Sequence, residues 1–156
     1  MKQSLTIIPM KRGHIKACDD IVAASEPWKT LREKVDFKQA ITRGQAFACI
    51  RREGGTIEVV GFILFTAEPV FARGGYLRAI GVAPSLRGQG IGGKLMAFAE
   101  KAISRRSDYC YLCVSSFNGE ARRLYERRGY AAVGELKDYI IAGASETIMQ
   151  KRLPRP

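Results

Sequence analysis

Hydrophobic positions along the chain change between helical and strand spacing, and these changes predict the order of the elements. Apolar residues three or four positions apart, typical of one helix face, predict helices over about 12–24, 31–43, 91–102 and 119–128. Short apolar runs bounded by Gly, Pro or charged residues predict strands over about 5–8, 47–51, 56–65, 76–82, 109–114, 130–133 and 147–151. The sequence Glu-Gly-Gly at 53–55 is typical of a hairpin turn.

The order of these elements predicts an α+β fold. Strand 76–82, the helix after it and strand 109–114 form a crossover, and crossovers of this kind are right-handed and join parallel strands. The earlier strands follow one another through short turns and should be antiparallel. We therefore expect a mixed, mostly antiparallel sheet of six or seven strands with one parallel pair, in an α/β/α arrangement.

Composition sets the broad class of the protein. The length of 156 residues predicts one domain over 1–156. No apolar run reaches the roughly 18–20 residues that cross a bilayer, and the first residues lack the apolar stretch of a secretory signal, so no membrane partner is expected. The four cysteines lie in apolar segments, where buried free thiols are typical, and this suits a reducing compartment. The expected location is the cytoplasm.

The cysteines do not predict a metal site. Cys110 and Cys113 have the spacing of half a zinc site, but they fall in the predicted strand 109–114, where positions three apart point to opposite faces. The chain also has one His and no second closely spaced Cys pair. We therefore expect no bound metal.

The segment from Val82 to Lys94 carries the strongest chemical signal. It reads Val-Ala-Pro-Ser-Leu-Arg-Gly-Gln-Gly-Ile-Gly-Gly-Lys and joins a strand to an amphipathic helix. Its glycines let a ligand approach the backbone, and the amides at a helix N-terminus attract phosphate groups. Arg87 adds a positive charge at the entrance. The segment therefore predicts a binding site for a phosphate or a pyrophosphate.

Two nucleotide-binding loops share this spacing but fail on other requirements. A dinucleotide site needs its first glycine at the strand end and a carboxylate about twenty residues later, whereas five residues separate Val82 from Gly88 and no such carboxylate follows. A Walker A loop needs a hydroxyl after its lysine, where this chain has Leu95. If the loop is considered without the rest of the chain, the alternative is a glycine-rich turn that binds no ligand.

A second motif lies about 30 residues after the loop, beyond one predicted strand. It runs from Asn118 to Tyr130 as Asn-Gly-Glu-Ala-Arg-Arg-Leu-Tyr-Glu-Arg-Arg-Gly-Tyr, with Asn118 placed to cap a helix and the last glycine placed to end it. This motif and Arg87-x-x-Gly-x-Gly92 together resemble the two signature segments of the GCN5-related N-acetyltransferase (GNAT) superfamily. The resemblance covers about residues 56–152, and the earlier part matches only in its order of elements.

The resemblance implies the acyl-CoA N-acyltransferase fold, with acetyl-CoA as cosubstrate and no metal. In that family the parallel strands splay apart, helped by a β-bulge that the resemblance places near Gly81, and the pantetheine arm lies between them. By resemblance, the residues that bind the cofactor are Ile80, Gly81, Val82, Arg87, Gly88, Gln89, Gly90, Ile91, Gly92, Gly93 and Asn118.

The resemblance also implies direct attack of a primary amine on the acetyl thioester in a ternary complex. Tyr125 is the expected acid for the departing thiolate, because an ordinary Tyr is protonated at pH 7. The strand before the loop has no carboxylate to act as base. Glu68 is selected as the base, and the other candidates are Glu26, Glu33 and a water chain. The expected acceptor-binding residues are Glu26, Trp28 and Tyr76.

Two other functions stay open at this point. The missing strand carboxylate also fits a module that binds acetyl-CoA without catalysis. The net charge of +11 and four arginines within 122–128 fit a nucleic-acid-binding protein, but the arginine spacing is that of a solvated helix face and argues against it. The sequence does not identify the acceptor amine, which could be a small molecule or a peptide, and the resemblance allows a homodimer.

Overall fold

A seven-stranded sheet with helices on both faces forms the protein. The computed structural model describes residues 4–155. The strands are β1 (Ser4–Pro9), β2 (Ala46–Glu53), β3 (Thr56–Val70), β4 (Gly74–Val82), β5 (Tyr109–Ser115), β6 (Ala131–Leu136) and β7 (Glu146–Arg152), in the spatial order β1-β2-β3-β4-β5-β7-β6. All neighbouring strands are antiparallel except β4 and β5, which are parallel. The expected mixed sheet with one parallel pair is confirmed.

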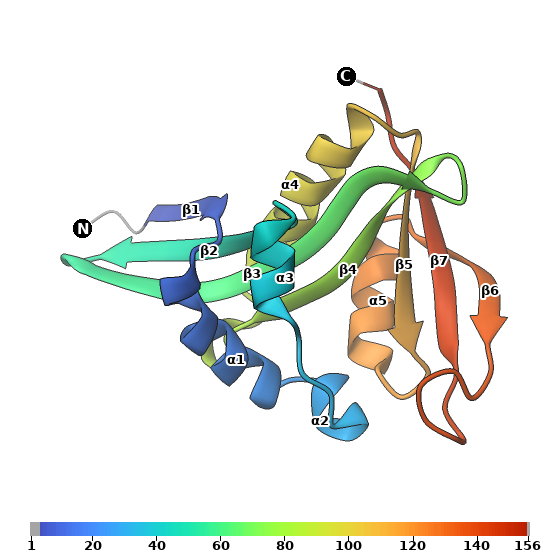
Figure 1. The fold of residues 1–156 in the computed structure, drawn as a ribbon, viewed down its shortest axis with the longest axis horizontal. Coiled ribbons are helices and arrows are strands. Elements are labelled where there is room, and N and C mark those ends of the chain that lie inside the picture. Colours follow the sequence, from blue (N-terminus) through green and yellow to red (C-terminus); the bar gives the residue numbers. More distant parts are fainter. Residues whose placement is uncertain (1–3, 156) are drawn as a thin grey trace.

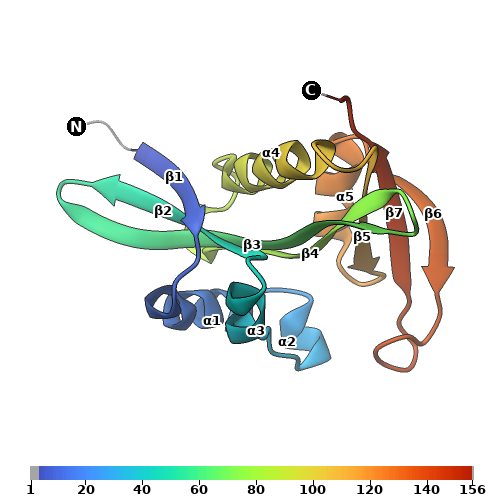
Figure 2. The ribbon, with the colours of Figure 1, turned by 45° about the horizontal axis from the view of Figure 1, so that its top comes forward.

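The helices lie in two layers. They are α1 (Ile15–Ala23), α2 (Trp28–Leu31), α3 (Phe37–Thr42), α4 (Ile91–Ser104) and α5 (Gly119–Arg127). Figure 2 shows α1, α2 and α3 below the sheet and α4 and α5 above it. Two apolar clusters follow from this arrangement, one between α4 and the sheet around Leu95 and one on the opposite face around Phe62. Helical turns were expected over 31–43, and the structure has them at Leu31 and over Phe37–Thr42. The two helices α2 and α3 are separate, and Asp36 caps α3 by accepting from the Gln39 amide at 2.9 Å.

The parallel pair opens part-way along its length. Residues Gly74–Leu77 of β4 pair with Tyr109–Leu112 of β5, and the pairing ends there. On its other side, β4 pairs Leu77 with Phe65 and Ala79 with Leu64, so Arg78 is an extra residue in the ladder. The β-bulge is therefore at Arg78 and not near Gly81. Figure 1 shows β4 and β5 diverging beyond this point.

The open edge of β4 carries unpaired backbone groups. The Ala83 amide donates to the Val60 carbonyl on the β3 side at 2.9 Å, and a Cβ on Gly61 would lie 2.9 Å from the Gly81 carbonyl oxygen. Because backbone groups alternate in direction along a strand, those of Ile80 and Val82 point the other way, into the opening. The two residues that were expected to bind pantetheine through their backbone have the required direction.

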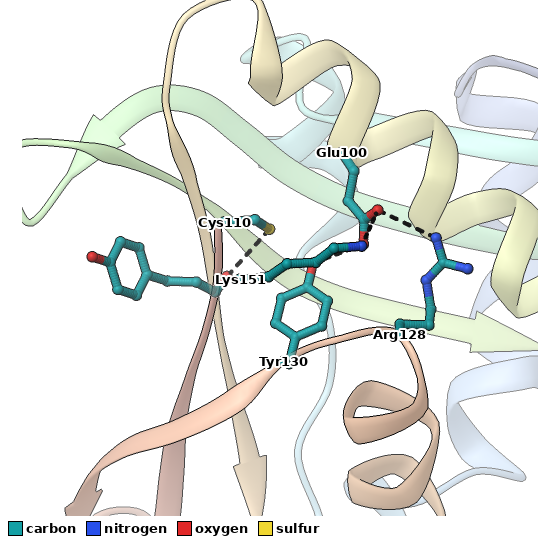
Figure 3. A network of polar contacts seen from close by, with 6 residues as sticks. Glu100, Cys110, Arg128, Tyr130 and Lys151 are labelled. Carbon is teal, nitrogen blue, oxygen red and sulfur yellow. Dashed lines mark hydrogen bonds and ion pairs between the residues drawn. The ribbon is translucent and has the colours of Figure 1, made fainter. Parts of the chain in front are cut away.

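A buried carboxylate holds α4 against the C-terminal elements. Figure 3 shows Glu100 of α4 facing Arg128, Tyr130 and Lys151. Its carboxylate accepts hydrogen bonds from Arg128 at 3.2 Å, from the Tyr130 hydroxyl at 3.0 Å and from Lys151 at 3.0 Å. Two cations balance the charge of this one carboxylate, so its burial is compensated. The contacts fix α4, which begins at the glycine loop, relative to the end of α5 and to β7.

We expect Glu100→Gln to lower the free energy of unfolding by about 2 kcal/mol, because the neutral amide cannot pair with two cations. Urea unfolding followed by circular dichroism measures the change. Glu126→Gln is the matched control, since Glu126 forms an exposed pair with Arg122 four residues away, and its expected change is below about 0.5 kcal/mol. Equal losses in the two variants would contradict a structural role for Glu100.

Candidate active site

A cavity of about 420 Å³ lies at the open ends of β4 and β5, between the N-terminal turns of α4 and α5. All of the residues that were expected to bind a cofactor line it except Gln89, which is exposed. The remaining lining residues are Ser25, Leu86, Glu120, Ala121, Leu124, Tyr125 and Arg127. The two sequence motifs, which are about 30 residues apart, therefore line one cavity together.

The glycine loop gives this cavity an anion-binding end. Gly88 and Gly90 have φ angles of 76° and 79°, in the left-handed region that favours glycine. Gly90 is the N-cap of α4 and no side chain caps the helix, so the first amides of α4 are available to a ligand. Arg87 donates to the Ser25 hydroxyl at 2.7 Å, which ties the loop to the end of α1. The helix dipole, the amides and the guanidinium together favour a phosphate group here.

A smaller cavity, of about 180 Å³, adjoins the larger one. Ile80, Asn118 and Tyr125 line both, so the two cavities meet at these residues. Asn118 caps α5 by accepting from the Ala121 amide at 3.4 Å. The rest of the smaller cavity is lined by Pro27, Trp28, Leu31, Glu33, Tyr76, Arg78, Ala79, Cys113, Val114, Ser115, Tyr139, Ile140 and Glu146. Two ligands that filled the two cavities would therefore meet beside Tyr125.

Tyr125, which was expected to act as the acid, lines both cavities. It lies on α5, it is buried, and its ring centroid is 6.1 Å from that of Tyr130. Burial disfavours the phenolate and raises the pKa of Tyr125 to about 12. The hydroxyl therefore carries its proton throughout the neutral range.

Two of the three expected acceptor-binding residues line the smaller cavity. The ring centroids of Trp28 and Phe62 are 5.9 Å apart, so the two rings pack together. Tyr76 lies on β4 and is half-buried. Glu26 lines neither cavity. Its carboxylate accepts from the Thr30 amide and hydroxyl, at 3.2 and 2.9 Å, and so supports the short helix α2.

The expected catalytic residue Glu68 lies outside the site. It is exposed, lines neither cavity and forms an ion pair with Arg106. The reason is the β3–β4 hairpin, in which Thr66 pairs with Tyr76 near the turn while Gly61 pairs with Val82 at the cavity end. Glu68 follows Thr66 toward the turn, so the structure gives no support to its use as the base.

The sequence interpretation missed the carboxylate that does lie in the smaller cavity. Glu146, the first residue of β7, is buried, lines the cavity and accepts a hydrogen bond from the Ser115 hydroxyl. Burial raises the pKa of Glu146, and the hydrogen bond from Ser115 lowers it. The negative charge of Glu33 raises the pKa further. The only sequence signal was a Glu directly before a predicted strand.

Within residues 4–155 no cluster of His, Cys, Asp or Glu could hold a metal, and no helix is long and apolar enough to span a membrane.

The sequence matches the family model described as Acetyltransferase (GNAT) family over residues 15–130. This match covers most of the chain and both motifs. The chain belongs to the GNAT family. A curated relative, Acetyltransferase Atu2258 of Agrobacterium fabrum, is 37% identical over 78 residues, which are 49% of this GNAT chain and 55% of the relative. The chain thus spans about half the length of that relative.

Solved structures show the same fold. The NatC complex bound to Gag peptide and CoA contains a chain that superposes with a TM-score of 0.77 at 19% identity, covering 96% of this chain and 99% of that one. Arabidopsis thaliana NAA60 in complex with a bisubstrate analogue gives a TM-score of 0.76 at 19% identity, with 98% and 100% covered. The GNAT fold expected from the two motifs is confirmed.

Proposed function

We propose that this GNAT protein transfers the acetyl group of acetyl-CoA to a primary amine by direct attack in a ternary complex. The observation that carries the proposal is the meeting of the two cavities at Ile80, Asn118 and Tyr125. The larger has a phosphate-binding end and an open strand edge, which suit CoA and its pantetheine arm. The smaller has aromatic walls and carboxylates, which suit a cationic amine.

The residues at the junction supply the steps of the reaction. The Ile80 amide points into the opening and donates to the oxyanion that forms when the amine attacks. Tyr125 then protonates the departing thiolate. The alternation of backbone direction favours Ile80 over Gly81 for the oxyanion contact, because the Gly81 carbonyl points toward β3.

Calorimetric titration with acetyl-CoA, with ATP and NAD as controls, tests the proposal first. Micromolar binding of acetyl-CoA alone is the expected result, and release of free thiol with a panel of amines follows. The panel includes peptide N-termini, because the NatC neighbour was solved with a peptide. Binding without amine-dependent thiol release would indicate a non-catalytic module. Failure to bind acetyl-CoA, together with salt-dependent binding to duplex DNA or RNA, would favour a nucleic-acid-binding protein.

We also propose that the protein is cytoplasmic, which the free thiols of Cys18, Cys49, Cys110 and Cys113 support. A homodimer, which the resemblance allows, is tested by light scattering of the purified protein.

A further inference from the structure

The smaller cavity contains a buried carboxylate without a cationic partner. Glu146 is 7% exposed, and its hydrogen-bond donor is the Ser115 hydroxyl. Among the ion pairs of residues 4–155, none includes Glu146. Glu100 is similarly buried but is paired with Arg128 and Lys151. Because a buried carboxylate is costly without such a partner, the state of Glu146 requires an explanation.

The groups around Glu146 cannot supply that partner. Tyr76 and Cys113 lie beside it, and burial raises the pKa of both, so both are neutral at pH 7. Glu33 repels it, since the Glu33 charge raises the pKa of Glu146 further. The titratable and charged groups that line the cavity with Glu146 are Glu33 after α2, Tyr76 and Arg78 of β4, Cys113 of β5, Tyr125 of α5 and Tyr139 of the β6–β7 connection. Arg78 is exposed and forms no ion pair with Glu146.

The cavity also contains no other buried carboxylate. Glu33 is exposed, and Glu26 and Glu68 line neither cavity. The neutral Tyr76 and Cys113 would have to ionise before either could take a proton. Glu146 is thus the one group among the described lining residues that is both buried and able to accept a proton at neutral pH.

We propose that Glu146 pairs with the ammonium of the acceptor and takes the proton that the nitrogen must lose before it attacks. This assignment rests on the proposed acetyl transfer and names its base. Ser115 is a positioning residue, because its hydroxyl holds the carboxylate. The walls around the amine are formed by Trp28, Tyr76 and Tyr139. These walls favour primary amines whose amino group is attached to an apolar or aromatic group.

The proton and electron balance of the reaction is complete with two residues. One ammonium proton moves to Glu146, and the nitrogen lone pair then forms a bond to the thioester carbonyl carbon. The carbon–sulfur bond breaks and its electron pair leaves on the CoA sulfur, which takes the proton of Tyr125. The amide nitrogen still carries one proton too many, and this proton returns to the Tyr125 oxygen. Glu146 finally releases its proton to water.

The pH dependence of Glu146→Gln tests the assignment, with an alkylamine of pKa near 10 as acceptor. In the wild type, kcat/KM rises with pH through the pKa of Glu146 and is then level, because the carboxylate accepts the proton from the bound ammonium. In the variant, only the neutral amine reacts, which is about one part in a thousand at pH 7. We expect kcat/KM to be about 1,000-fold lower at pH 7 and to rise tenfold per pH unit, so that the defect is under about fivefold near pH 9.5.

Two further variants separate catalysis from folding. Glu126→Gln removes an exposed carboxylate that lines neither cavity and should keep the level wild-type profile. Glu146→Asp keeps a carboxylate and should restore part of the level region. A Glu146→Gln profile that is lowered equally at every pH, with acetyl-CoA affinity and melting temperature unchanged, would overturn the proposal.

A binding measurement tests the ion pair without any turnover. With CoA bound, the wild type should bind phenethylamine at least tenfold more tightly than 2-phenylethanol, and Glu146→Gln should lose this preference. If thiol release fails with every amine but the preference is present, the proposed acetyl transfer is overturned and the ammonium site stands. If the preference is equal in the two proteins, Glu146 is not the partner of the ammonium.

Discussion

Gly92→Glu is expected to weaken acetyl-CoA binding by more than about 100-fold while the protein still folds. Gly92 lies in the first turn of α4, and a Cβ there would meet Leu124 at 3.8 Å and Val82 at 3.9 Å, which are ordinary contact distances. Because Val82 and Leu124 both line the larger cavity, a longer side chain would enter the space assigned to the cofactor. Its negative charge would also oppose a phosphate at the helix N-terminus. Calorimetry measures the affinity, and circular dichroism checks the fold.

Gly92→Ala is the matched control for this prediction. The added methyl has room, and alanine favours a helix more than glycine does, so we expect acetyl-CoA affinity within about threefold of the wild type and no loss of stability. If Gly92→Glu bound acetyl-CoA as well as Gly92→Ala does, the cofactor could not occupy the cavity between α4 and α5.

Tyr125→Phe is expected to lower kcat by about 100-fold with little change in acetyl-CoA affinity. The phenol lies where the two cavities meet, and its loss removes the proton that the thiolate takes up. The pKa of Tyr125, raised to about 12, means that the wild-type hydroxyl donates over the whole range below about pH 11 and adds no pH limb of its own there. Steady-state thiol release gives kcat, and calorimetry gives the affinity.

Tyr130→Phe separates this effect from a general loss of packing. Tyr130 packs edge-to-face near Tyr125, but its hydroxyl donates to Glu100 and it lines neither cavity. We expect a lower melting temperature and an unchanged kcat. An unchanged kcat in Tyr125→Phe would remove Tyr125 from the mechanism, whatever the result for Tyr130.

The parts of the site that the sequence predicted are those set by local rules. The close approach that the loop glycines allow, the uncapped start of α4 and the Asn118 cap all depend on residues within one turn of one another. Helical periodicity likewise placed α4 and α5 closely. These segments could be interpreted without the rest of the chain.

The parts that were missed depend on long-range pairing. Glu146 reaches Ser115 because β7 inserts between β5 and β6, whereas chain order alone gives no reason for β6 to lie at the edge. Glu68 was selected because β4 has no carboxylate, but β3 continues to Val70, and the antiparallel register carries Glu68 away from the cavities. The bulge at Arg78 is also a property of two strands together, so neither strand predicts its position alone.

The β4–β5 ladder is the shortest in the sheet. Four residue pairs, from Gly74 with Tyr109 to Leu77 with Leu112, are the only strand pairing described between β1–β4 and β5–β7. We then expect amides in β6 and β7 to exchange with solvent through openings that leave β2 and β3 intact. A ligand that bridges Ile80 and Asn118 contacts both sides of this ladder, so we expect its binding to slow exchange in strands that it does not touch.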